Sequence, residues 1–402
     1  MRILLIGAFT AWLSLAMVTP GHAQKIDPDV KTLVDGNTDF GLTLYQRLAQ
    51  KDGNLFLSPY SISNAFGMCY AGAKGNTADE MKTTLRFNLG EDRLHPAFAK
   101  LIGALDGEGK KRPFQLTVAN RLWGQKDYGF LPAFTKVGSD HYGAGLEEVD
   151  YAGAPEAARL KINGWVEQKT KDKIKDLIPK GVLDNMTRLV LTNAIYFKAA
   201  WVNPFEPSQT KPGSFSLADG KSAKVPMMHS NNRGRYADLG TFSMVQIPYV
   251  GYQQSMLVLL PKKKDGLADV EKKLTAANLN AWTKKLSTHI VDLKLPKFKV
   301  TAEFKLNDVL KEMGMKDAFI FGKADFSGMA TREKLYITAV LHKAFVDVNE
   351  AGTEAAASTA IEVGTRSLPP RATFHADRPF LFVIQDYRTG SILFVGRVAN
   401  PG

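Results

Sequence analysis

Hydrophobic residues along the chain follow two spacings, one typical of helices and one typical of strands. Apolar residues that recur every three or four positions predict helices over 29–50, 61–71, 77–86, 155–170, 267–274 and 304–313. Two further segments, 188–198 and 334–348, are apolar at both odd and even positions, which is typical of strands in a sheet covered on both faces. Because helices and strands are mixed without a regular βαβ rhythm, the pattern favours the α+β class.

The segment 350–370 sorts its residues by parity. Odd positions from 353 to 363 carry Thr, Ala, Ala, Thr, Ile and Val, whereas both glutamates of this stretch fall at even positions. A period of two is the spacing of a β-strand, so the segment is suited to enter a sheet with its odd side chains buried. An alanine-rich surface helix is the alternative. Glycines at both ends and the pair Pro369-Pro370 argue against that helix.

Residues 1–23 have the pattern of a secretory signal peptide. Arg2 precedes an apolar run over 3–18, and small residues occupy the positions before Gln24 that a signal peptidase reads. A membrane helix is the alternative, but the run is shorter than the roughly 20 apolar residues that cross a bilayer. We therefore expect a secreted protein, extracellular or, in a bacterium, periplasmic, without a membrane anchor. The remainder, 24–402, has neither a linker nor a repeat and predicts one domain.

Composition and charge narrow the classes of partner. The chain has 402 residues, of which 45% are hydrophobic and 23% charged, the proportions of a soluble globular protein. Its formal net charge is +12, or +11 once Arg2 leaves with the signal peptide. The cations are dispersed among acidic residues, which favours solvated surfaces over a dedicated polyanion site. A polyanion partner stays an alternative, and the absence of a nucleic-acid motif predicts no nucleic-acid partner.

The sequence carries no recognisable catalytic or metal-binding motif. It has no nucleophile elbow, phosphate-binding loop, zinc-protease motif or dinucleotide fingerprint. The single cysteine, Cys69, lies in an apolar stretch where a packed thiol is more common than a nucleophile. No two of the seven histidines are spaced as a local metal-binding pair. The sequence therefore predicts neither an enzyme nor a metal or cofactor site.

Four regions of the chain resemble the serpin family of serine protease inhibitors. They comprise 54–63 with 72–77, 162–177, 192–205, and 374–401. The resemblance covers nearly all of the mature chain. It implies one large α+β domain with three β-sheets, about nine helices and an exposed reactive-centre loop at about 350–370. It also implies a monomer that traps a serine protease in a covalent 1:1 complex, because the cleaved loop inserts into the main sheet.

The resemblance assigns roles within the loop. The hinge residues would be Glu350, Gly352, Thr353, Ala355, Ala356, Ala357, Ser358 and Thr359. The family's usual spacing puts the scissile bond 16 residues beyond the hinge glutamate, at Arg366-Ser367, and a loop of different length would move it to Thr365 or Ser367. Trypsin-like proteases hold a guanidinium in an acidic pocket, so Arg366 implies a target of that class.

Residues outside the loop receive structural roles by the same resemblance. Ser58, Ser61, Asn193 and His342 would form a buried polar cluster beneath the point where the sheet opens, and Trp201 would lie near the top of that sheet. None of them would be catalytic. Two rivals remain: a non-inhibitory serpin that acts as a carrier or chaperone, and a basic protein that binds a polyanion. Asn185 begins a glycosylation motif that matters only in a eukaryotic host.

Overall fold

The computed structural model describes residues 26–106, 112–332, 335–353 and 369–402. The predicted signal peptide, the hinge residues 355–359 and the predicted bond Arg366-Ser367 lie outside these ranges. The described residues form nine α-helices: α1 (Pro28–Leu48), α2 (Pro59–Tyr70), α3 (Gly75–Leu85), α4 (Glu91–Asp106), α5 (Pro132–Tyr142), α6 (Pro155–Lys169), α7 (Leu267–Lys272), α8 (Ala276–Lys284) and α9 (Asn307–Glu312). Two 3-10 helices are η1 (Pro207–Gln209) and η2 (Asp317–Phe319).

The same residues form fifteen strands, in the order β1 (Leu55–Leu57), β2 (Phe114–Gln125), β3 (Leu146–Val149), β4 (Leu189–Ala200), β5 (Lys211–Ser216), β6 (Ser222–Asp238), β7 (Phe242–Pro248), β8 (Gln254–Pro261), β9 (Ser287–Pro296), β10 (Phe298–Lys305), β11 (Ile337–Asn349), β12 (Gly352–Thr353), β13 (Arg371–His375), β14 (Phe380–Asp386) and β15 (Ile392–Val398).

All six helices expected from periodicity are present, as α1, α2, α3, α6, α7 and α9, with ends displaced by up to three residues. Helix α2 begins where the hydroxyl of Ser58 accepts the N–H of Ser61 at 3.2 Å, with Pro59 as the first helical residue. Helix α9 begins three residues late because Phe304 still pairs with β11 as part of β10. The prediction missed α4, α5 and α8. Pro96 interrupts the pattern of α4, and α5 and α8 bury few side chains, so their apolar periodicity is weak.

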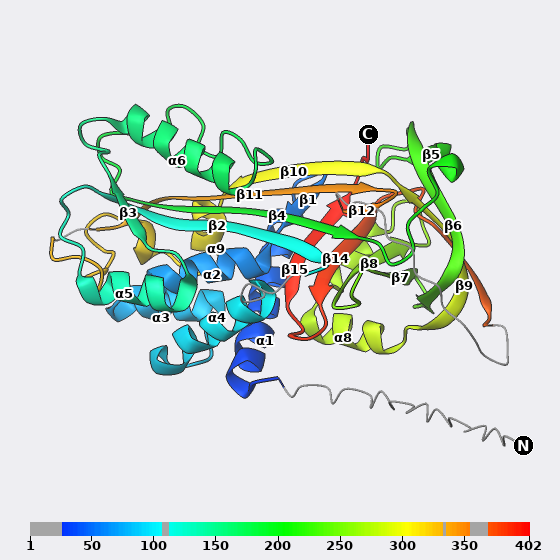
Figure 1. Cartoon of the computed structure of the whole chain (residues 1–402), viewed down its shortest axis with the longest axis horizontal. Helices are drawn as coiled ribbons and strands as arrows, with labels where there is room; N and C mark the ends of the chain where they lie inside the picture. The colour runs from blue at the N-terminus through cyan, green and yellow to red at the C-terminus, as the bar shows by residue number, and fades with distance from the viewer. Residues whose placement is uncertain (1–25, 107–111, 333–334, 354–368) are drawn as a thin grey trace, which may run out of the picture.

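A six-stranded sheet, in the order β10-β11-β12-β4-β2-β3, runs along the molecule (Figure 1). Strand β4 pairs antiparallel with β2 on one side and parallel with β11 on the other. Eleven of the twelve residues of β4 are buried, which confirms the expectation of a strand covered on both faces. In β11 the residues nearest the hinge alternate between buried and half-buried, so one face of the sheet is more open at that end.

The remaining nine strands form a second sheet in which β6 has three partners. Its first residues, up to Met227, pair with β5, its middle part from Met227 to Tyr236 pairs with β9, and its last four residues, from Arg235 to Asp238, pair with β7. Because the one long strand β6 bonds to all of these strands, two of the three expected sheets are joined into one by continuous hydrogen bonding. This sheet forms the end of the molecule on the right of Figure 1.

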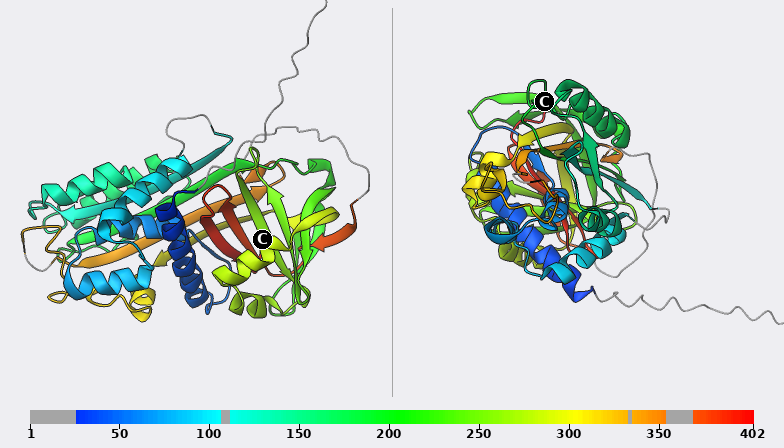
Figure 2. Two further views of the ribbon diagram at one scale, coloured as in Figure 1. Left: turned by 90° about the horizontal axis from the view of Figure 1, so that it is seen from below. Right: turned by 90° about the vertical axis from the view of Figure 1, so that its left-hand side faces the viewer.

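Two hydrophobic clusters flank the six-stranded sheet. The larger packs α1–α5 and the β14–β15 hairpin against the face that carries Leu189, Leu191, Ile195 and Phe197. The smaller lies under α6, on the face that carries Val190 and Ala194. Figures 1 and 2 show α6 on one side of the sheet and the other N-terminal helices on the opposite side. Odd and even residues of β4 therefore point into different clusters, as strand alternation requires.

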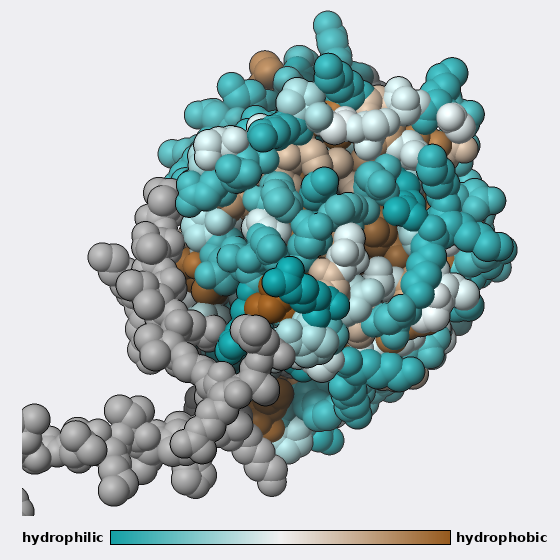
Figure 3. Space-filling model, turned by 90° about the vertical axis from the view of Figure 1, so that its right-hand side faces the viewer, coloured by the Kyte–Doolittle hydropathy of each residue, from teal (hydrophilic) through white to brown (hydrophobic). Residues whose placement is uncertain are grey.

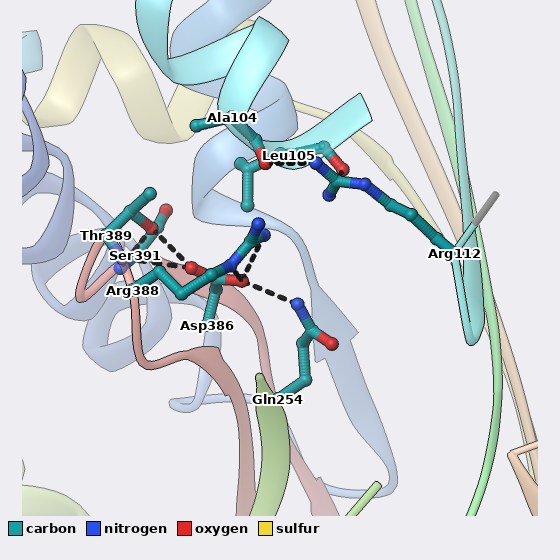
Figure 4. Close-up of polar contacts among 8 residues, drawn as sticks. All are labelled: Ala104, Leu105, Arg112, Gln254, Asp386, Arg388, Thr389 and Ser391. Carbon is teal, nitrogen blue, oxygen red and sulfur yellow. Dashed lines mark hydrogen bonds and ion pairs between the residues drawn. The ribbon is translucent and has the colours of Figure 1, made fainter. Parts of the chain in front are cut away.

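Two sets of polar contacts hold the β14–β15 hairpin and the end of α4 (Figure 4). The fully buried carboxylate of Asp386 closes the β14–β15 hairpin by accepting bonds from Gln254, Arg388 and Thr389. The guanidinium of Arg112 binds the last carbonyls of α4, at Ala104 and Leu105. Contacts of this kind satisfy helix and turn ends that would otherwise be left without partners. Among the described helices, none combines the length and apolarity needed to cross a membrane.

Candidate functional site

We call the boundary between β4 and β11 the seam; the strand pairing across it differs from one end to the other. At the hinge end β12 lies between the two strands: Gly352 and Thr353 pair with Ala200 and Ala199 of β4, and with Asn349 and Val348 of β11. Beyond β12 the strands pair with each other directly, from Ile337–Leu189 to Phe345–Tyr196. The start of the hinge is therefore already a strand of the main sheet.

Gly352 permits this insertion because its backbone adopts φ = 151°, a region that side chains disfavour. A Cβ atom at this position would lie 2.1 Å from the carbonyl oxygen of Ala199. The oxygen belongs to the backbone and cannot move aside. A glycine is therefore required where the chain turns from β11 into β12.

Thr353 is fully buried and is held by an aromatic pair. Its hydroxyl lies 2.8 Å from the hydroxyl of Tyr249, and the Tyr249 ring stacks on Trp201 with ring centroids 4.5 Å apart. Burial raises the pKa of Tyr249 well above its usual range, and the hydrogen bond to Thr353 opposes that shift in part. The phenol is therefore neutral, and its O–H can donate a hydrogen bond to the hydroxyl of Thr353.

The turn before β12 is fastened by Trp201 and by an ion pair. The indole N–H of Trp201 donates to the carbonyl of Asn349 at 3.0 Å, and its backbone N–H donates to Ala351. The carboxylate of Glu350 lies 2.8 Å from Lys297 Nζ and accepts the hydroxyl of Thr210. Partial burial opposes ionisation of Glu350, but the hydrogen bonds from Lys297 and Thr210 outweigh it and lower the pKa. The start of the hinge is thus fixed from both sides.

Halfway along the seam, a buried polar cluster crosses it. The amide of Asn193 on β4 donates to Ser61 Oγ at 2.7 Å, and its oxygen accepts the Nδ1–H of His342 on β11. The other imidazole nitrogen, Nε2, accepts the backbone N–H of Ser58 at 3.3 Å. The hydroxyl of Ser58 in turn donates to the carbonyl of Leu393 on β15. The structure brings together Ser58, Ser61, Asn193 and His342.

His342 in this cluster is a neutral imidazole. It is completely buried, and burial lowers its pKa to about 3. Its two contacts use one nitrogen as donor and the other as acceptor, which only the neutral ring can do. The geometry therefore makes His342 a structural cross-link between β4 and β11.

Sequence reasoning missed several residues that hold this seam. Asn120 of β2 joins the polar cluster through Ser61 and Asn193, with its oxygen 2.6 Å from the Asn193 amide. Tyr249, which follows β7, and Lys297, which lies between β9 and β10, are far from the hinge in the sequence. Asn120 gave no distinct local signal, because the strand 114–125 also carries Gln115, Thr117 and Arg121. Tyr249 and Lys297 offered none, because many tyrosines and lysines fill similar positions.

The arrangement is suited to a conformational change and offers no reactive group in the described part of the chain. Cys69 is fully buried, and burial raises the pKa of its thiol well above the usual range. No group of three or more histidine, cysteine or acidic side chains in the described ranges could hold a metal ion. What the seam supplies is a strand that has started to insert, above a parallel strand pair joined by a polar cross-link.

Comparisons with known proteins agree with this geometry. The family model of serpins, described as serine protease inhibitors, matches residues 35–401. Leukocyte elastase inhibitor of Equus caballus is 40% identical over 382 residues, which cover 92% of this chain and all of the relative. Antithrombin-III of Mus musculus is 39% identical over 396 residues, covering 95% of this chain and 85% of the relative.

Solved structures show the same fold. Uncleaved ovalbumin superposes with a TM-score of 0.83 at 28% identity, covering 92% of this chain and all of ovalbumin. Serpin48 of the insect Tenebrio molitor gives 0.82 at 30% identity, over 95% of this chain and all of that protein. The α+β fold expected from the sequence is confirmed by these neighbours. The chain therefore belongs to the serpin family of serine protease inhibitors.

Proposed function

We propose that this serpin is a secreted suicide-substrate inhibitor of a trypsin-like protease. The protease serine attacks the carbonyl carbon of Arg366, and the peptide bond to Ser367 breaks, giving an acyl-enzyme and a free amine at Ser367. The released strand then enters the sheet between β4 and β11. Fourteen residues, from Thr353 to Arg366, extend over about 46 Å at ~3.3 Å per residue, so the attached protease is carried along the sheet.

The observation that carries the proposal is the position of β12 at the head of the seam. Gly352 and Thr353 already occupy strand positions there, and each further residue advances one position along β4. Continuing this register would set Val363 opposite Leu189, the first residue of β4. The inserted strand thereby replaces the direct pairing of β4 and β11 with two antiparallel ladders, and antiparallel pairs are slightly more stable than parallel ones.

The polar residues of the loop match the polar positions along this path. The odd residues would face the larger hydrophobic cluster, where Ala199, Phe197 and Ile195 lie. Thr353 meets the hydroxyl of Tyr249 there. Thr359 would fall between Asn193 and His342, which now bond to each other across the seam. A hydroxyl at 359 could take up the two polar groups that insertion separates, whereas an apolar residue would leave them without partners.

We propose the class of the target protease from Arg366 and not from the relatives. Their names point to different proteases, since one is an elastase inhibitor and another an antithrombin. A desolvated acidic pocket discriminates strongly in favour of an arginine at the bond it cleaves. Secretion is proposed from the signal-like residues 1–23.

Incubation with trypsin, followed by a denaturing gel, tests the proposal. We expect a 1:1 adduct that survives denaturation, because the ester to the protease serine is covalent. Arg366→Lys, which keeps the charge, should retain the adduct. Arg366→Leu should lower the association rate with trypsin by orders of magnitude and favour a chymotrypsin-like enzyme. Complete cleavage of the loop without any adduct would contradict the inhibitory function, and unchanged trypsin inhibition by Arg366→Leu would contradict the assigned bond.

A further inference from the structure

A groove lies outside the seam, where β6 leaves β7 to pair with β9. Two adjoining hollows share the lining residues Asn203, Arg233, Gly234, Gln246 and Pro248. The outer hollow has a volume of about 360 Å³ and is also lined by Arg235, Tyr252 and Thr288. This volume falls within the range of small-molecule sites in proteins.

Positive charge at this groove is not balanced within its walls. The hollows are lined by two arginines, and no acidic residue is found among their described lining residues. Asp292 of β9 lies between the lining residues Val291 and Leu293, and its carboxylate is taken by His229 and His375. The groove therefore favours an anion.

The two arginines differ in what they already bind. Arg235 donates to the side chain of Gln246 and to the carbonyl of Leu286, so its guanidinium is held in place. Arg233 is exposed, and its guanidinium makes no hydrogen bond or ion pair with any residue that the structure describes. Its planar group of N–H donors is free to bind a carboxylate or sulfonate in a bidentate manner.

The inner hollow adds an apolar wall. Phe205, Val245, Ile247 and Leu293 line it, beside the shared Arg233. At the outer mouth Tyr252 is 58% exposed, although large aromatic side chains are usually buried. A ligand with an anionic group and an apolar body would satisfy both surfaces.

Tyr252 is also held in a strained backbone conformation. It has φ = 55° and follows Gly251 at φ = 89°, in a turn closed by the bond from Tyr252 N–H to the Tyr249 carbonyl. Residues other than glycine rarely adopt positive φ, and such strain concentrates at binding sites. A glycine at 252 would relax the turn, so the aromatic ring is kept at a conformational cost.

We propose that this groove binds a small amphipathic organic anion. The carboxylate or sulfonate would pair with Arg233, and the flat apolar body would lie between Tyr252 and the apolar wall. The surface around that end of the molecule supports a small ligand over a protein partner. Hydrophilic residues cover most of it, and hydrophobic residues appear only as small separate areas (Figure 3).

Titration calorimetry with 8-anilino-1-naphthalenesulfonate as the probe tests this site on the intact protein. We expect one bound molecule per chain and at least tenfold weaker binding to Arg233→Gln. The control Arg47→Gln, which removes an exposed cation from α1, should bind like the unmodified protein. N-phenyl-1-naphthylamine, which lacks the sulfonate, should bind with an affinity that does not depend on residue 233.

Tyr252→Gly supplies an independent measurement. It should weaken binding of the probe severalfold while leaving the melting temperature unchanged or higher, because the positive φ suits glycine. A purely structural role for Tyr252 would give the reverse, a lower melting temperature with unchanged affinity, and would overturn the stacking assignment. Absence of stoichiometric binding, or equal affinity for Arg233→Gln and the unmodified protein, would overturn the site.

Discussion

The two edges of β4 are built differently, although both are buried in the same sheet. Its edge with β2 is an unbroken antiparallel ladder from Phe114–Ala199 to Gly124–Leu189. Its edge with β11 is parallel, is interrupted near Ile337 and is already parted at the hinge end by β12. Antiparallel pairs are slightly more stable per residue, so we expect an entering strand to separate β4 from β11 and to leave β2 in place. The weaker edge of β4 is thus the one at which the proposed insertion would occur.

The largest expected effect comes from opening that seam. Cleavage of the loop near Arg366 by a protease that is not trapped should raise the melting temperature by on the order of 10 °C or more, since several kcal/mol of new strand pairing at ~2 °C per kcal/mol would be gained. Calorimetry before and after verified cleavage measures the change. A double variant Ala355→Arg/Ala357→Arg, cleaved in the same way, should show no such rise. An unchanged melting temperature in the cleaved unmodified protein would mean that the seam stays closed.

The next largest effect should depend on which face of the sheet the side chain of an inserted loop residue occupies. In the inserted form, the register of β12 would set residue 355 between Phe197 and Val346, both buried in the larger cluster, and residue 354 between Lys198 and Asp347 at the more open face. Ala355→Arg would bury an unpaired cation at a cost of several kcal/mol. We expect its stoichiometry of inhibition to rise roughly tenfold, because ~1.4 kcal/mol slows insertion tenfold and the acyl-enzyme hydrolyses first.

Glu354→Arg is the matched control for this parity. It introduces the same side chain one residue away and should change the stoichiometry little. Equal damage from both variants would show that the two faces of the inserted strand are not distinguished.

Lowering the pH should destabilise the pairing of β4 with β11 more than its pairing with β2. The pKa of His342 is lowered by burial to about 3, below the ~6.5 of an unfolded histidine. The unfolded chain therefore binds more protons between these values, and stability falls as pH decreases from about 6.5 toward 3, by up to ~1.4 kcal/mol per pH unit. His95, whose pKa burial lowers to about 4 with help from His141 and Lys74, adds a similar loss.

Urea unfolding at several pH values separates these contributions. His342→Asn should flatten the acid dependence, whatever its stability at neutral pH. His95→Gln should remove only the His95 share. If His342→Asn leaves the slope below pH 6.5 unchanged, the imidazole does not couple the seam to pH.

The smallest expected effect tests the polar match at Thr359. In the uncleaved chain β4 and β11 pair directly at Asn193 and His342, so Thr359→Val should leave the native stability unchanged. In the cleaved, inserted form it would leave those buried groups short of a partner, at a cost of about 1–3 kcal/mol. The melting temperature of the cleaved form should fall by a few degrees, and Thr359→Ser should restore it. An equal shift in the uncleaved protein would contradict this register.

Local patterns determined much of the fold. The strands β4 and β11 followed from apolar residues at both parities, and six helices followed from their periodicity. The four regions that resemble serpins indicated the family, which the comparisons confirm. The hinge residues 355–359 stay a prediction, because they lie outside the described residues. Helices α4, α5 and α8 were not predicted, since a proline in α4 and the few buried side chains of α5 and α8 weakened their signal.

Partners across the fold could not be read in this way. The sequence shows that Glu350 carries a charge, but not that Lys297 pairs with it. It likewise shows that residue 352 is a glycine, but not that the carbonyl of Ala199 lies too close for any side chain there. The same holds for Asn120 in the polar cluster and for the free guanidinium of Arg233. Helix and strand propensity and the alternation of apolar residues depend only on neighbours in the sequence, so the sequence alone determines them. Contacts between strands more than a hundred residues apart depend on register, which only the packed tertiary structure decides.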